Sequence, residues 1–353
     1  MSKTDNMRAV YLDGHEGLSS VVVGERPKPS YGAGDVRVRI AAAGINRVDL
    51  YMANDGSGFR HELPLIMGVD GAGVIDAVGH GVTHRKAGER VVIYPAKFGD
   101  DEFSRRGDQM LSFQRAVPGE NFDGTFAEYM VVPAACAFPI SDALSFRDAA
   151  VLPTAYLTAW RMVTSAGQVT QEDTVLIHGV GGGASLAALQ FSKMRNARVI
   201  VTSSSDEKLA VAREYGADVM VNYRDHDVLD AVRTATNKRG VDVVIENVGE
   251  ATWDTSMRAA VGGGRIVVCG ATSGPNPKAD LQRVFIRQLQ IIGVTIGNFE
   301  EFRTLIDAAE RKLFVPHFDS VYGLEDVPEA LRKLDRGEQV GKIGITVNAD
   351  LGE

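Results

Sequence analysis

The stretch that decides the fold is Val175-Leu176-Ile177-His178-Gly179-Val180-Gly181-Gly182-Gly183-Ala184-Ser185-Leu186. An apolar segment typical of a buried strand leads directly into a glycine cluster, and the residues after the cluster favour a helix. Small residues let the backbone turn sharply and approach a ligand, while the first turn of a helix offers free N–H groups and a positive dipole end. The spacing of Gly179, Gly181 and Ala184 fits a degenerate fingerprint for a dinucleotide pyrophosphate. Alone, the pattern also fits a glycine-rich turn that only packs a helix against a strand.

The residues downstream continue the alternation of strand and helix. Expected strands are 175–177, 198–202, 219–221, 241–246, 265–269 and 291–294, and expected helices are 184–195, 207–215, 227–236 and 252–260. Six strands that alternate with helices predict a doubly wound parallel α/β sheet, in which ligands bind at the carboxyl ends of the strands. The residues expected to contact a dinucleotide there are Gly179, Gly181, Gly182, Gly183, Ala184, Ser185, Ser203, Ser204, Lys208, Tyr223, Asn247, Gly270, Ala271 and Ser273.

The residues after the second expected strand favour NADPH as the cofactor. A carboxylate at this place would accept hydrogen bonds from the ribose 2′-hydroxyl and repel a 2′-phosphate. The chain has Ser203-Ser204-Ser205 there, followed by Lys208. Hydroxyl groups donate hydrogen bonds to phosphate, and the lysine adds a positive charge. The same serines, followed by Asp206 and Glu207, also fit an ordinary helix N-terminus with capping hydroxyls and acids in the first turn.

Length and composition narrow the class of protein. A chain of 353 residues is expected to form two domains. The net charge of -8 and the lack of a Lys- or Arg-rich run disfavour nucleic acid and anionic membranes as partners. No apolar run is long enough to span a bilayer, and Met1 to Arg8 shows no secretion signal. The two cysteines, Cys136 and Cys269, are expected to be buried, reduced thiols, which indicates a cytoplasmic setting.

The two ends of the chain differ from its middle. Residues 1–150 contain short strands broken by Gly and Pro, which predicts a mostly β domain. Residues 151–295 form the expected dinucleotide-binding domain. Residues 296–353 contain two expected helices and a last strand at 342–347, which we expect to return to the first domain. A small-molecule site is expected in the cleft between the two domains.

Five further motifs resemble the medium-chain dehydrogenase/reductase superfamily over nearly the whole chain. They lie at 42–51, 68–73, 124–129, 152–160 and 341–343. The resemblance implies a GroES-like catalytic domain, a Rossmann cofactor domain and hydride transfer involving a nicotinamide. It also implies that Thr158 meets the nicotinamide and that the superfamily's dimers, or dimers of dimers, form through the edge near 291–296. Lys342 either reaches the cofactor phosphates or is a solvated lysine beside the last strand.

Departures from the family indicate a branch without zinc. Zinc alcohol dehydrogenases have a zinc-ligand cysteine where this chain has Asn46, a proton-relay Ser or Thr at Val48, and Gly-His-Glu at Gly68-Val69-Asp70. Catalytic zinc needs about three protein donors, and valine supplies none; no metal is therefore expected. The second zinc of that family is held by four cysteines whose positions fall on Phe98, Asp101, Ser104 and Ser112 here. Without a zinc ion to fix it, we expect the lobe that contains these four positions to be mobile or held by partner contacts.

The motif Gly44-Ile45-Asn46-x-x-Asp49-x-Tyr51 resembles the zinc-independent quinone oxidoreductases. In that interpretation, the Asn46 amide and the Tyr51 hydroxyl polarise a carbonyl oxygen as hydride arrives, and Asp49 orients them. The alternative for Asn46 and Asp49 is local turn bonding, and for Tyr51 it is packing in the cleft. Ser185 replaces the last glycine of that branch's turn, which adds a hydroxyl near the phosphates or shifts the helix start.

Four functions remain open at this point. The first is an NADPH-dependent, zinc-free reductase of quinones or other electron-poor enones. The second is an enoyl-thioester or other α,β-unsaturated carbonyl reductase, although Asn54 to Phe59 lacks the tyrosine of that class. The third is a metal-dependent alcohol dehydrogenase, which the missing ligands oppose. The fourth is a cofactor-binding protein that binds NADPH without turnover.

Overall fold

The structure is a computed structural model that describes residues 5–58 and 61–352. Phe59, which enters the argument against an enoyl-thioester reductase, and Met1 to Thr4 therefore lie outside the described residues. The chain forms two compact units, one of residues 1–154 and 298–353 and the other of residues 155–297. The division expected from the sequence placed these boundaries at 150/151 and 295/296.

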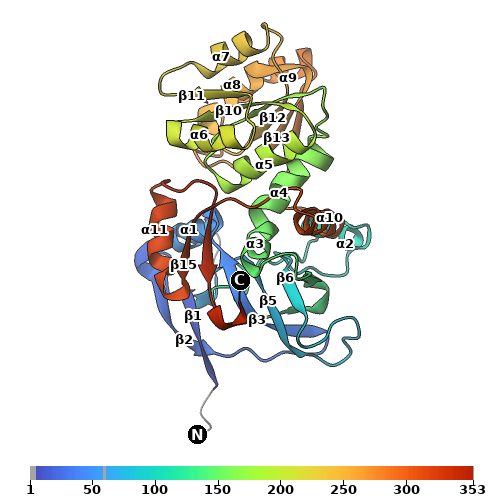
Figure 1. Ribbon diagram of the computed structural model, residues 1–353, viewed down its shortest axis with the longest axis vertical. Helices are drawn as coiled ribbons and strands as arrows, with labels where there is room; N and C mark the ends of the chain where they lie inside the picture. The colour runs from blue at the N-terminus through green and yellow to red at the C-terminus, as the bar shows by residue number, and fades with distance from the viewer. Residues whose placement is uncertain (1–4, 59–60, 353) are drawn as a thin grey trace. The chain divides into compact units, whose positions relative to one another are not determined.

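The strands of the first unit are β1 Asn6–Leu12, β2 Val21–Pro27, β3 Asp35–Gly44, β4 Leu65–Ile66, β5 Asp70–Val78, β6 Arg90–Ile93, β7 Tyr129–Pro133, β8 Ala137–Pro139, β15 Phe318–Gly323 and β16 Lys342–Thr346. They pair antiparallel, except that β15 and β16 are parallel. The larger sheet has the order β15-β16-β3-β5-β6-β8, with β7 also paired to β3, and the smaller has the order β2-β1-β4. The last strand, β16, pairs antiparallel with β3, so the two ends of the chain meet in one sheet; Figure 1 shows these red and blue strands in the same unit.

Helices of the first unit position the polar groups discussed below. They are α1 Arg47–Asp55, α2 Glu102–Arg105, α3 Phe146–Ala150, α10 Phe299–Glu310 and α11 Val327–Asp335. Helix α1 starts directly after β3, the central strand of the larger sheet, and ends at Gly56, which adopts the left-handed conformation with φ of 63°. A glycine in that conformation is a common helix C-cap because it has no Cβ to clash. Helix α1 is therefore fixed at both ends, with its first turn against the sheet.

The second unit is a six-stranded parallel sheet in the order β11-β10-β9-β12-β13-β14. Its strands are β9 Thr174–Ile177, β10 Arg198–Ser203, β11 Val219–Asn222, β12 Val241–Glu246, β13 Ala260–Val268 and β14 Gln290–Gly293. Its helices are α4 Leu157–Arg161, α5 Gly183–Met194, α6 Asp206–Glu214, α7 Val228–Ala235, α8 Glu250–Ala259 and α9 Leu281–Ile286 (Figure 1). Leu176, Ile200 and Val244 are fully buried in the centre of the sheet, as expected for parallel strands covered on both faces.

Three details of the second unit and its entry differ from the sequence-based expectation. Leu152–Tyr156 forms a π-helical turn before α4 begins, and the expected helices given above do not include this segment. Strand β13 begins five residues earlier than expected, with a register shift opposite β12 that accommodates the glycines before Arg265. Helix α9 was not expected, because its six residues are too few to show a helical period.

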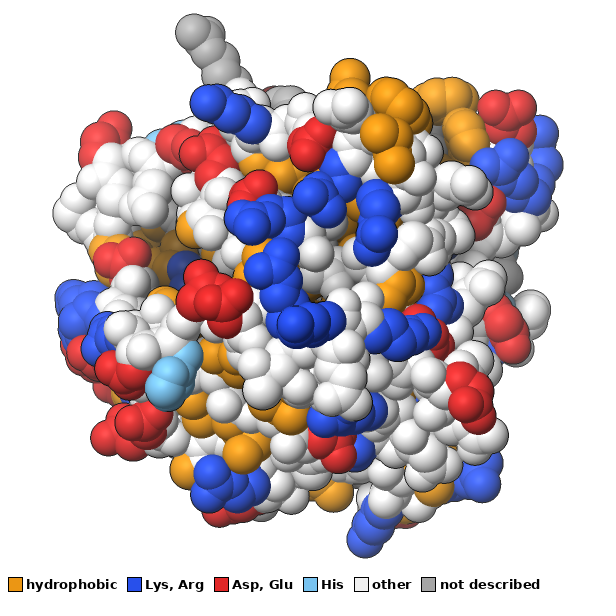
Figure 2. Space-filling model, turned by 90° about the horizontal axis from the view of Figure 1, so that it is seen from above, with side chains coloured by type: hydrophobic (Ala, Val, Ile, Leu, Met, Phe, Trp, Pro, Cys, Tyr) orange, Lys and Arg blue, Asp and Glu red, His pale blue; other side chains and the backbone are white. Residues whose placement is uncertain are grey.

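The acidic net charge is unevenly spread over the surface. Viewed from the end at which α7 and α9 lie, Lys and Arg side chains form a band across the middle of the face, and hydrophobic side chains gather at one margin (Figure 2). The value of -8 is thus an average over the chain. Within the described residues, no helix combines the length and the apolar character needed to cross a membrane.

Candidate active site

A buried polar cluster lies at the first turn of α1. Asn46 is the residue before the helix, and its backbone N–H donates to Oδ2 of Asp49 at 2.8 Å. The exposed fractions of the two residues are 8% and 2%. An acid at this position stabilises the helix because its carboxylate faces the positive end of the helix dipole. This contact is a local bond at the junction between β3 and α1, as in the alternative interpretation of Asn46 and Asp49.

Lys342 enters this cluster from the opposite end of the sequence. Its Nζ lies 2.6 Å from Oδ1 of Asn46, 2.8 Å from the carbonyl oxygen of Ile45 and 3.3 Å from Oδ2 of Asp70. Its side chain is 3% exposed and that of Asp70 is 0% exposed. An ammonium group has three protons, and three oxygen atoms of its own chain accept them. The side chain does not reach solvent, which corrects the expectation of a solvated lysine. All three protons have acceptors within the chain, and a contact of Lys342 with the cofactor phosphates stays a prediction.

Asp70, the first residue of β5, completes the cluster. Its Oδ2 accepts a hydrogen bond from Nδ2 of Asn46 at 2.8 Å, and its Oδ1 accepts one from the hydroxyl of Thr154 at 2.6 Å. The hydroxyl of Thr125, which is also fully buried, donates to the carbonyl oxygen of Asp70 at 2.8 Å. Each polar atom of the Asp70 side chain thus has a partner, as a buried carboxylate requires.

Burial changes the proton affinity of two members of the cluster. Burial raises the pKa of Asp49 to about 7; the N–H of Asn46 opposes the rise, the charge of Asp70 adds to it, and Lys342 opposes it. Burial also lowers the pKa of the Lys342 ammonium, and the neighbouring Asp70 carboxylate opposes this shift. The cluster therefore places two carboxyl groups around one cation.

These contacts describe the surroundings of the predicted catalytic side chains, whose roles stay a prediction. The Asn46 amide was expected to polarise a substrate carbonyl, but its Nδ2 donates to Asp70 and to the carbonyl oxygen of Gly44, the latter at 3.4 Å. Both of its protons are therefore engaged inside the protein. Tyr51, on the same helix, is 41% exposed, and its hydroxyl has no hydrogen-bond partner among the described residues. Of the three predicted side chains, Tyr51 alone keeps a donor available to a substrate.

The side chains at this place do not fit a zinc ion. Val69 has no donor atom, Oδ1 of Asn46 already accepts from the Lys342 ammonium, and a fixed positive charge 3.3 Å from Asp70 opposes the entry of a second cation. Across residues 5–58 and 61–352, no group of three or more His, Cys, Asp and Glu side chains is arranged to hold a metal ion.

The lobe that holds a second zinc in zinc relatives is closed here by hydrogen bonds. Asp101 accepts four of them: from the N–H and hydroxyl of Ser104 at 2.9 and 3.0 Å, from the hydroxyl of Ser112 at 2.7 Å and from the N–H of Phe113 at 2.8 Å. The bonds from Ser112 and Ser104 hold the pKa of Asp101 well below its usual range. Phe98 occupies the remaining one of the four positions. The centroid of its ring lies 5.2 Å from that of Phe299 in α10. The lobe therefore has internal hydrogen bonds and a ring contact in place of the zinc ligands, and its mobility or a partner contact stays a prediction.

In the second unit, the glycine cluster forms a turn suited to a dinucleotide. Gly179 adopts the left-handed conformation with φ of 62°, and α5 begins at Gly183. A Cβ at Gly181 would lie 2.4 Å from Cδ of Lys208, so the lysine stem lies against the turn. The first N–H groups of a helix have no partner within the helix. Helix α5 therefore presents free backbone donors beside a lysine, which fits a pyrophosphate.

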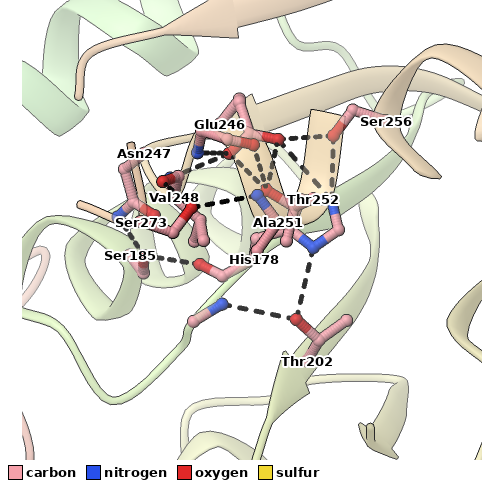
Figure 3. A network of polar contacts seen from close by, with 12 residues as sticks. His178, Ser185, Thr202, Glu246, Asn247, Val248, Ala251, Thr252, Ser256 and Ser273 are labelled. Carbon is pink, nitrogen blue, oxygen red and sulfur yellow. Dashed lines mark hydrogen bonds and ion pairs between the residues drawn. The ribbon is translucent and has the colours of Figure 1, made fainter. Parts of the chain in front are cut away.

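A buried carboxylate organises the loops at the same edge of the sheet. Glu246, the last residue of β12, is 0% exposed. Its Oε1 accepts from the N–H groups of Val248 and Gly249 at 2.8 and 3.1 Å. The hydroxyl of Thr252 lies 2.9 Å from both carboxyl oxygens, and that of Ser256 lies 2.5 Å from Oε2 (Figure 3). These contacts fix the loop that follows β12.

The hydrogen bonds assign the protonation of His178. The hydroxyl of Ser256 donates a hydrogen bond to Glu246. The Ser256 oxygen therefore accepts a hydrogen bond from the N–H at Nε2 of His178, at 3.0 Å. Nδ1 of His178 then accepts from the hydroxyl of Thr202 at 3.4 Å, and that hydroxyl accepts from the N–H of Gly179 at 3.3 Å. Burial lowers the pKa of His178, opposed by Glu246, which agrees with a neutral ring. His178 is thus a buried, hydrogen-bonded residue at the end of β9.

Ser185 and Asn247 form a latch between the glycine turn and the loop after β12. The hydroxyl of Ser185 donates to the carbonyl oxygen of His178 at 2.8 Å and accepts from Nδ2 of Asn247 at 2.7 Å. Ser185 is fully buried. Its hydroxyl was expected either to lie near the phosphates or to shift the helix start; it bonds within the protein, and its place relative to the phosphates stays a prediction.

The remaining predicted cofactor residues take varied positions. Ser203 is buried, and its hydroxyl accepts from the N–H of Ser205 at 3.2 Å. Tyr223 is 52% exposed after β11, whereas Thr158 is buried in α4. The hydroxyl of Ser273 donates to the carbonyl oxygen of Val248 at 2.7 Å. Ser204, Gly270 and Ala271 lie at the carboxyl ends of β10 and β13, as predicted.

Both thiols are protonated at neutral pH. Cys136 is buried and Cys269 is half-buried. Burial raises the pKa of each to about 12, with the charge of Glu246 adding to the shift at Cys269.

The sequence analysis missed two organising residues. The hydroxyl of Thr154 donates a hydrogen bond to Asp70. Glu246 is the centre of the hydrogen-bond network in the second unit that includes Thr252, Ser256 and His178. A charged residue that ends an otherwise apolar parallel strand, as Glu246 does in Val241–Glu246, was the available signal. Thr154 carries no such signal, because a lone threonine in an apolar segment is common.

Comparison with known proteins agrees with this architecture. Residues 32–142 match the family described as an alcohol dehydrogenase GroES-like domain, and residues 183–311 match the family described as a zinc-binding dehydrogenase. An alcohol dehydrogenase of Geobacillus stearothermophilus is 32% identical over 92% of this chain and 95% of its own. A quinone oxidoreductase of Rattus norvegicus is 26% identical over 84% of this chain and 83% of its own. A crystal structure of an NAD-dependent alcohol dehydrogenase superposes with a TM-score of 0.93 at 36% identity, covering 97% of this chain and 100% of that one. The chain therefore belongs to the medium-chain dehydrogenase/reductase superfamily and is a nicotinamide-dependent oxidoreductase.

Proposed function

We propose that this protein is an NADPH-dependent, metal-independent reductase that transfers hydride to a quinone or another electron-poor carbonyl compound or enone. The observation that carries the proposal is the cluster at the first turn of α1. There, an ammonium group is bonded to Asn46 and Asp70, and no zinc donor set remains. The acceptor must then be electron-poor enough to take hydride without a metal to polarise it.

The preference for NADPH is supported by the end of β10. Ser203, the last residue of this strand, is followed by Ser204 and Ser205, so no carboxylate stands where it would repel a 2′-phosphate. Lys208 adds a positive charge one helical turn later. The hydroxyl of Ser205 is occupied in capping α6, because it accepts from the N–H of Lys208 at 3.3 Å. Among the three serines, Ser204 is therefore the one assigned to the phosphate, with the positive charge of Lys208 nearby in the sequence.

Tyr51 is the side chain assigned to the substrate oxygen. When bound, a reduced nicotinamide supplies the hydride, which is the difficult part of the chemistry. The Tyr51 hydroxyl then donates a hydrogen bond, and finally a proton, to the oxygen that gains negative charge. Asn46 and Asp49 act only by holding α1. A single available donor suits a reactive acceptor such as a quinone.

The deciding experiment is NADPH oxidation with 9,10-phenanthrenequinone after exhaustive EDTA treatment, with NADH in a parallel assay. Turnover that survives chelation and is faster with NADPH is the expected result. Activity that EDTA abolishes and zinc restores would contradict metal independence. A preference for NADH would contradict the assignment of Ser204 to the phosphate.

One observation favours a second candidate, an NADPH-binding protein without turnover. Two of the three predicted catalytic side chains, Asn46 and Asp49, are engaged inside the protein. Quenching of the intrinsic fluorescence by NADPH, combined with no oxidation in the presence of quinones or enones, would support this candidate. Loss of quinone reduction in Tyr51→Phe with unchanged NADPH binding would exclude it.

We also propose that a second copy of this chain covers the edge strand β14. This strand ends the six-stranded sheet, and an exposed edge offers unpaired N–H and C=O groups. Leu281, Phe285 and Ile286 in α9 are 69%, 68% and 61% exposed, and Ile291 in β14 is 46% exposed. Light scattering is expected to give twice the mass of one 38.0 kDa chain. A mass equal to one chain would contradict the pairing.

A further inference from the structure

Lys342 supplies the positive charge of a cluster that otherwise contains acids. The charged groups that act on Asp49 are Asp70, Lys342 and Glu120, and two of these three are carboxyl groups. Lys342 itself is bonded to Asp70 and is influenced by Asp49. A neutral side chain at position 342 would leave these carboxyl groups buried without a counter-charge, which is strongly unfavourable.

The ammonium also joins three segments that are distant in the sequence. The lysine belongs to β16, its partners Ile45 and Asn46 join β3 to α1, and Asp70 begins β5. Three oxygen ligands around one charge resemble the environment of a bound cation. Here, however, the cation is covalently attached to the chain.

We propose that the Lys342 ammonium is a built-in cation that fixes α1 and thereby positions Tyr51. This inference rests on the proposed function for the role of Tyr51, but not for the role of the cation. Two of the three ligand oxygens, on Ile45 and Asn46, directly precede the first residue of α1. A helix of nine residues transmits a displacement of its first turn to Tyr51. Lys342 is therefore a positioning residue, and it contacts no substrate.

The charge requirement is tested by replacing the lysine and its partner separately and together. Lys342→Met keeps most of the side-chain volume and is expected to lower Tm by on the order of 10 °C. Lys342→Met/Asp70→Asn removes both charges and is expected to recover a large part of that loss. Lys333→Met is the matched control, because Lys333 pairs with Asp319 near the surface, and it is expected to change Tm by only about 2 °C. A double variant that is less stable than Lys342→Met would overturn the proposal.

The cation itself is tested by chemical rescue of Lys342→Ala. Ethylammonium is expected to raise the Tm of this variant and to restore kcat at least several-fold. Ethanol, which is neutral, and tetramethylammonium, which has no N–H donor, are expected to restore neither at equal ionic strength. Rescue by ethanol as well would show that the lysine only fills space, and the absence of rescue by any of the three would also overturn the proposal. If Lys342→Ala does not fold, the comparison of Lys342→Met with its double variant still decides the matter.

The activity readout separates this proposal from the proposed function. A displaced Tyr51 is expected to lower kcat about tenfold or more in Lys342→Met, with the KM for NADPH nearly unchanged. An unchanged kcat in a folded Lys342→Met protein would contradict the positioning role. If the wild-type protein reduces no quinone, the proposed function fails, while the Tm changes and the ethylammonium rescue still test the built-in cation.

Discussion

Two buried polar networks stabilise this protein in different ways. In the first unit, the acids around α1 are balanced by a full charge, the Lys342 ammonium. In the second unit, Glu246 is surrounded by hydroxyl and backbone N–H donors, and the neighbouring His178 is neutral. A network of charges depends on each partner, because removal of one leaves the other buried and unpaired. When one neutral donor is removed from around a buried carboxylate, only the hydrogen bond of that donor is lost.

The largest effect is expected where a charge loses its partner. Asp70→Asn keeps the shape of the side chain but leaves the Lys342 ammonium without its carboxylate, and it is expected to cost about 3 kcal/mol in the free energy of unfolding. Glu329→Gln is the control, because Glu329 pairs with Arg332 where both side chains are about half exposed, and the expected cost is below about 1 kcal/mol. Urea unfolding monitored by fluorescence measures both. Equal costs for the two variants would remove the contrast between a buried and an exposed pair.

The two networks are also expected to respond to pH in opposite directions. Asp49 has a pKa of about 7 in the folded protein and an ordinary value of 3.8, so between these values the folded state binds more protons. Its contribution therefore lowers the free energy of unfolding as pH rises from about 4 to 7, by on the order of 4 kcal/mol in total. The pKa of His178 is lowered from 6.5, so below pH 6.5 the unfolded state binds more protons and stability falls as pH falls.

Asp49→Asn isolates the first of these two contributions. The amide oxygen can still accept the N–H of Asn46, so the helix start is preserved. The variant is expected to gain stability relative to the wild type as pH rises from 4 to 7, measured as the difference in unfolding free energy at each pH. A difference that stays constant over this range would show that Asp49 does not titrate with a raised pKa.

A smaller effect is expected when the carboxylate of the second network is made neutral. Glu246→Gln keeps one acceptor oxygen for the N–H groups of Val248 and Gly249 and for the hydroxyl of Thr252. It loses the oxygen that accepts from the hydroxyl of Ser256, at an expected cost of about 1–2 kcal/mol. Thr252→Val, which removes one of those hydroxyls, is expected to cost about 1 kcal/mol. If Glu246→Gln destabilises the protein as much as Asp70→Asn, the neutral donors around Glu246 give no advantage over the charged cluster.

The smallest effect is expected at the latch between the glycine turn and the loop after β12. Ser185→Ala removes bonds to His178 and Asn247 and is expected to weaken NADPH binding about three- to tenfold. Ser192→Ala is the matched control, because Ser192 lies in the same helix, is fully buried, and has no hydrogen-bond partner for its hydroxyl. Fluorescence titration with NADPH compares them. Equal affinities in the two variants would show that the latch does not shape the cofactor site.

The sequence predicted the fold of the second unit well because its signals are local. An apolar strand followed by small residues and a helix start, repeated along the chain, fixes a parallel sheet with few alternatives. Helix α9 and the π-helical turn at Leu152–Tyr156 were missed because they are short and their conformation depends on packing. The edge of the sheet that carries the glycine turn followed from the same pattern.

The side-chain contacts of the candidate site were less predictable. Lys342 and Asn46 are separated by 296 positions, and no periodic pattern links them. Family resemblance placed Asn46 and Lys342 near a reacting substrate and cofactor, whereas their contacts engage them with each other. Ser185 was noticed as a departure from glycine, but its partner Asn247 became visible only when the loops after β9 and β12 were brought together.

The state of the two thiols has a consequence for the chemistry that such an enzyme meets. Quinones and enones are electrophiles that alkylate thiolates, and the thiolate is the reactive form of cysteine. Cys136 and Cys269 are the only cysteines of the chain, and with pKa values of about 12 both remain protonated at physiological pH. If the protein reduces quinones or enones as proposed, neither of its cysteines offers a reactive thiolate to these electrophiles.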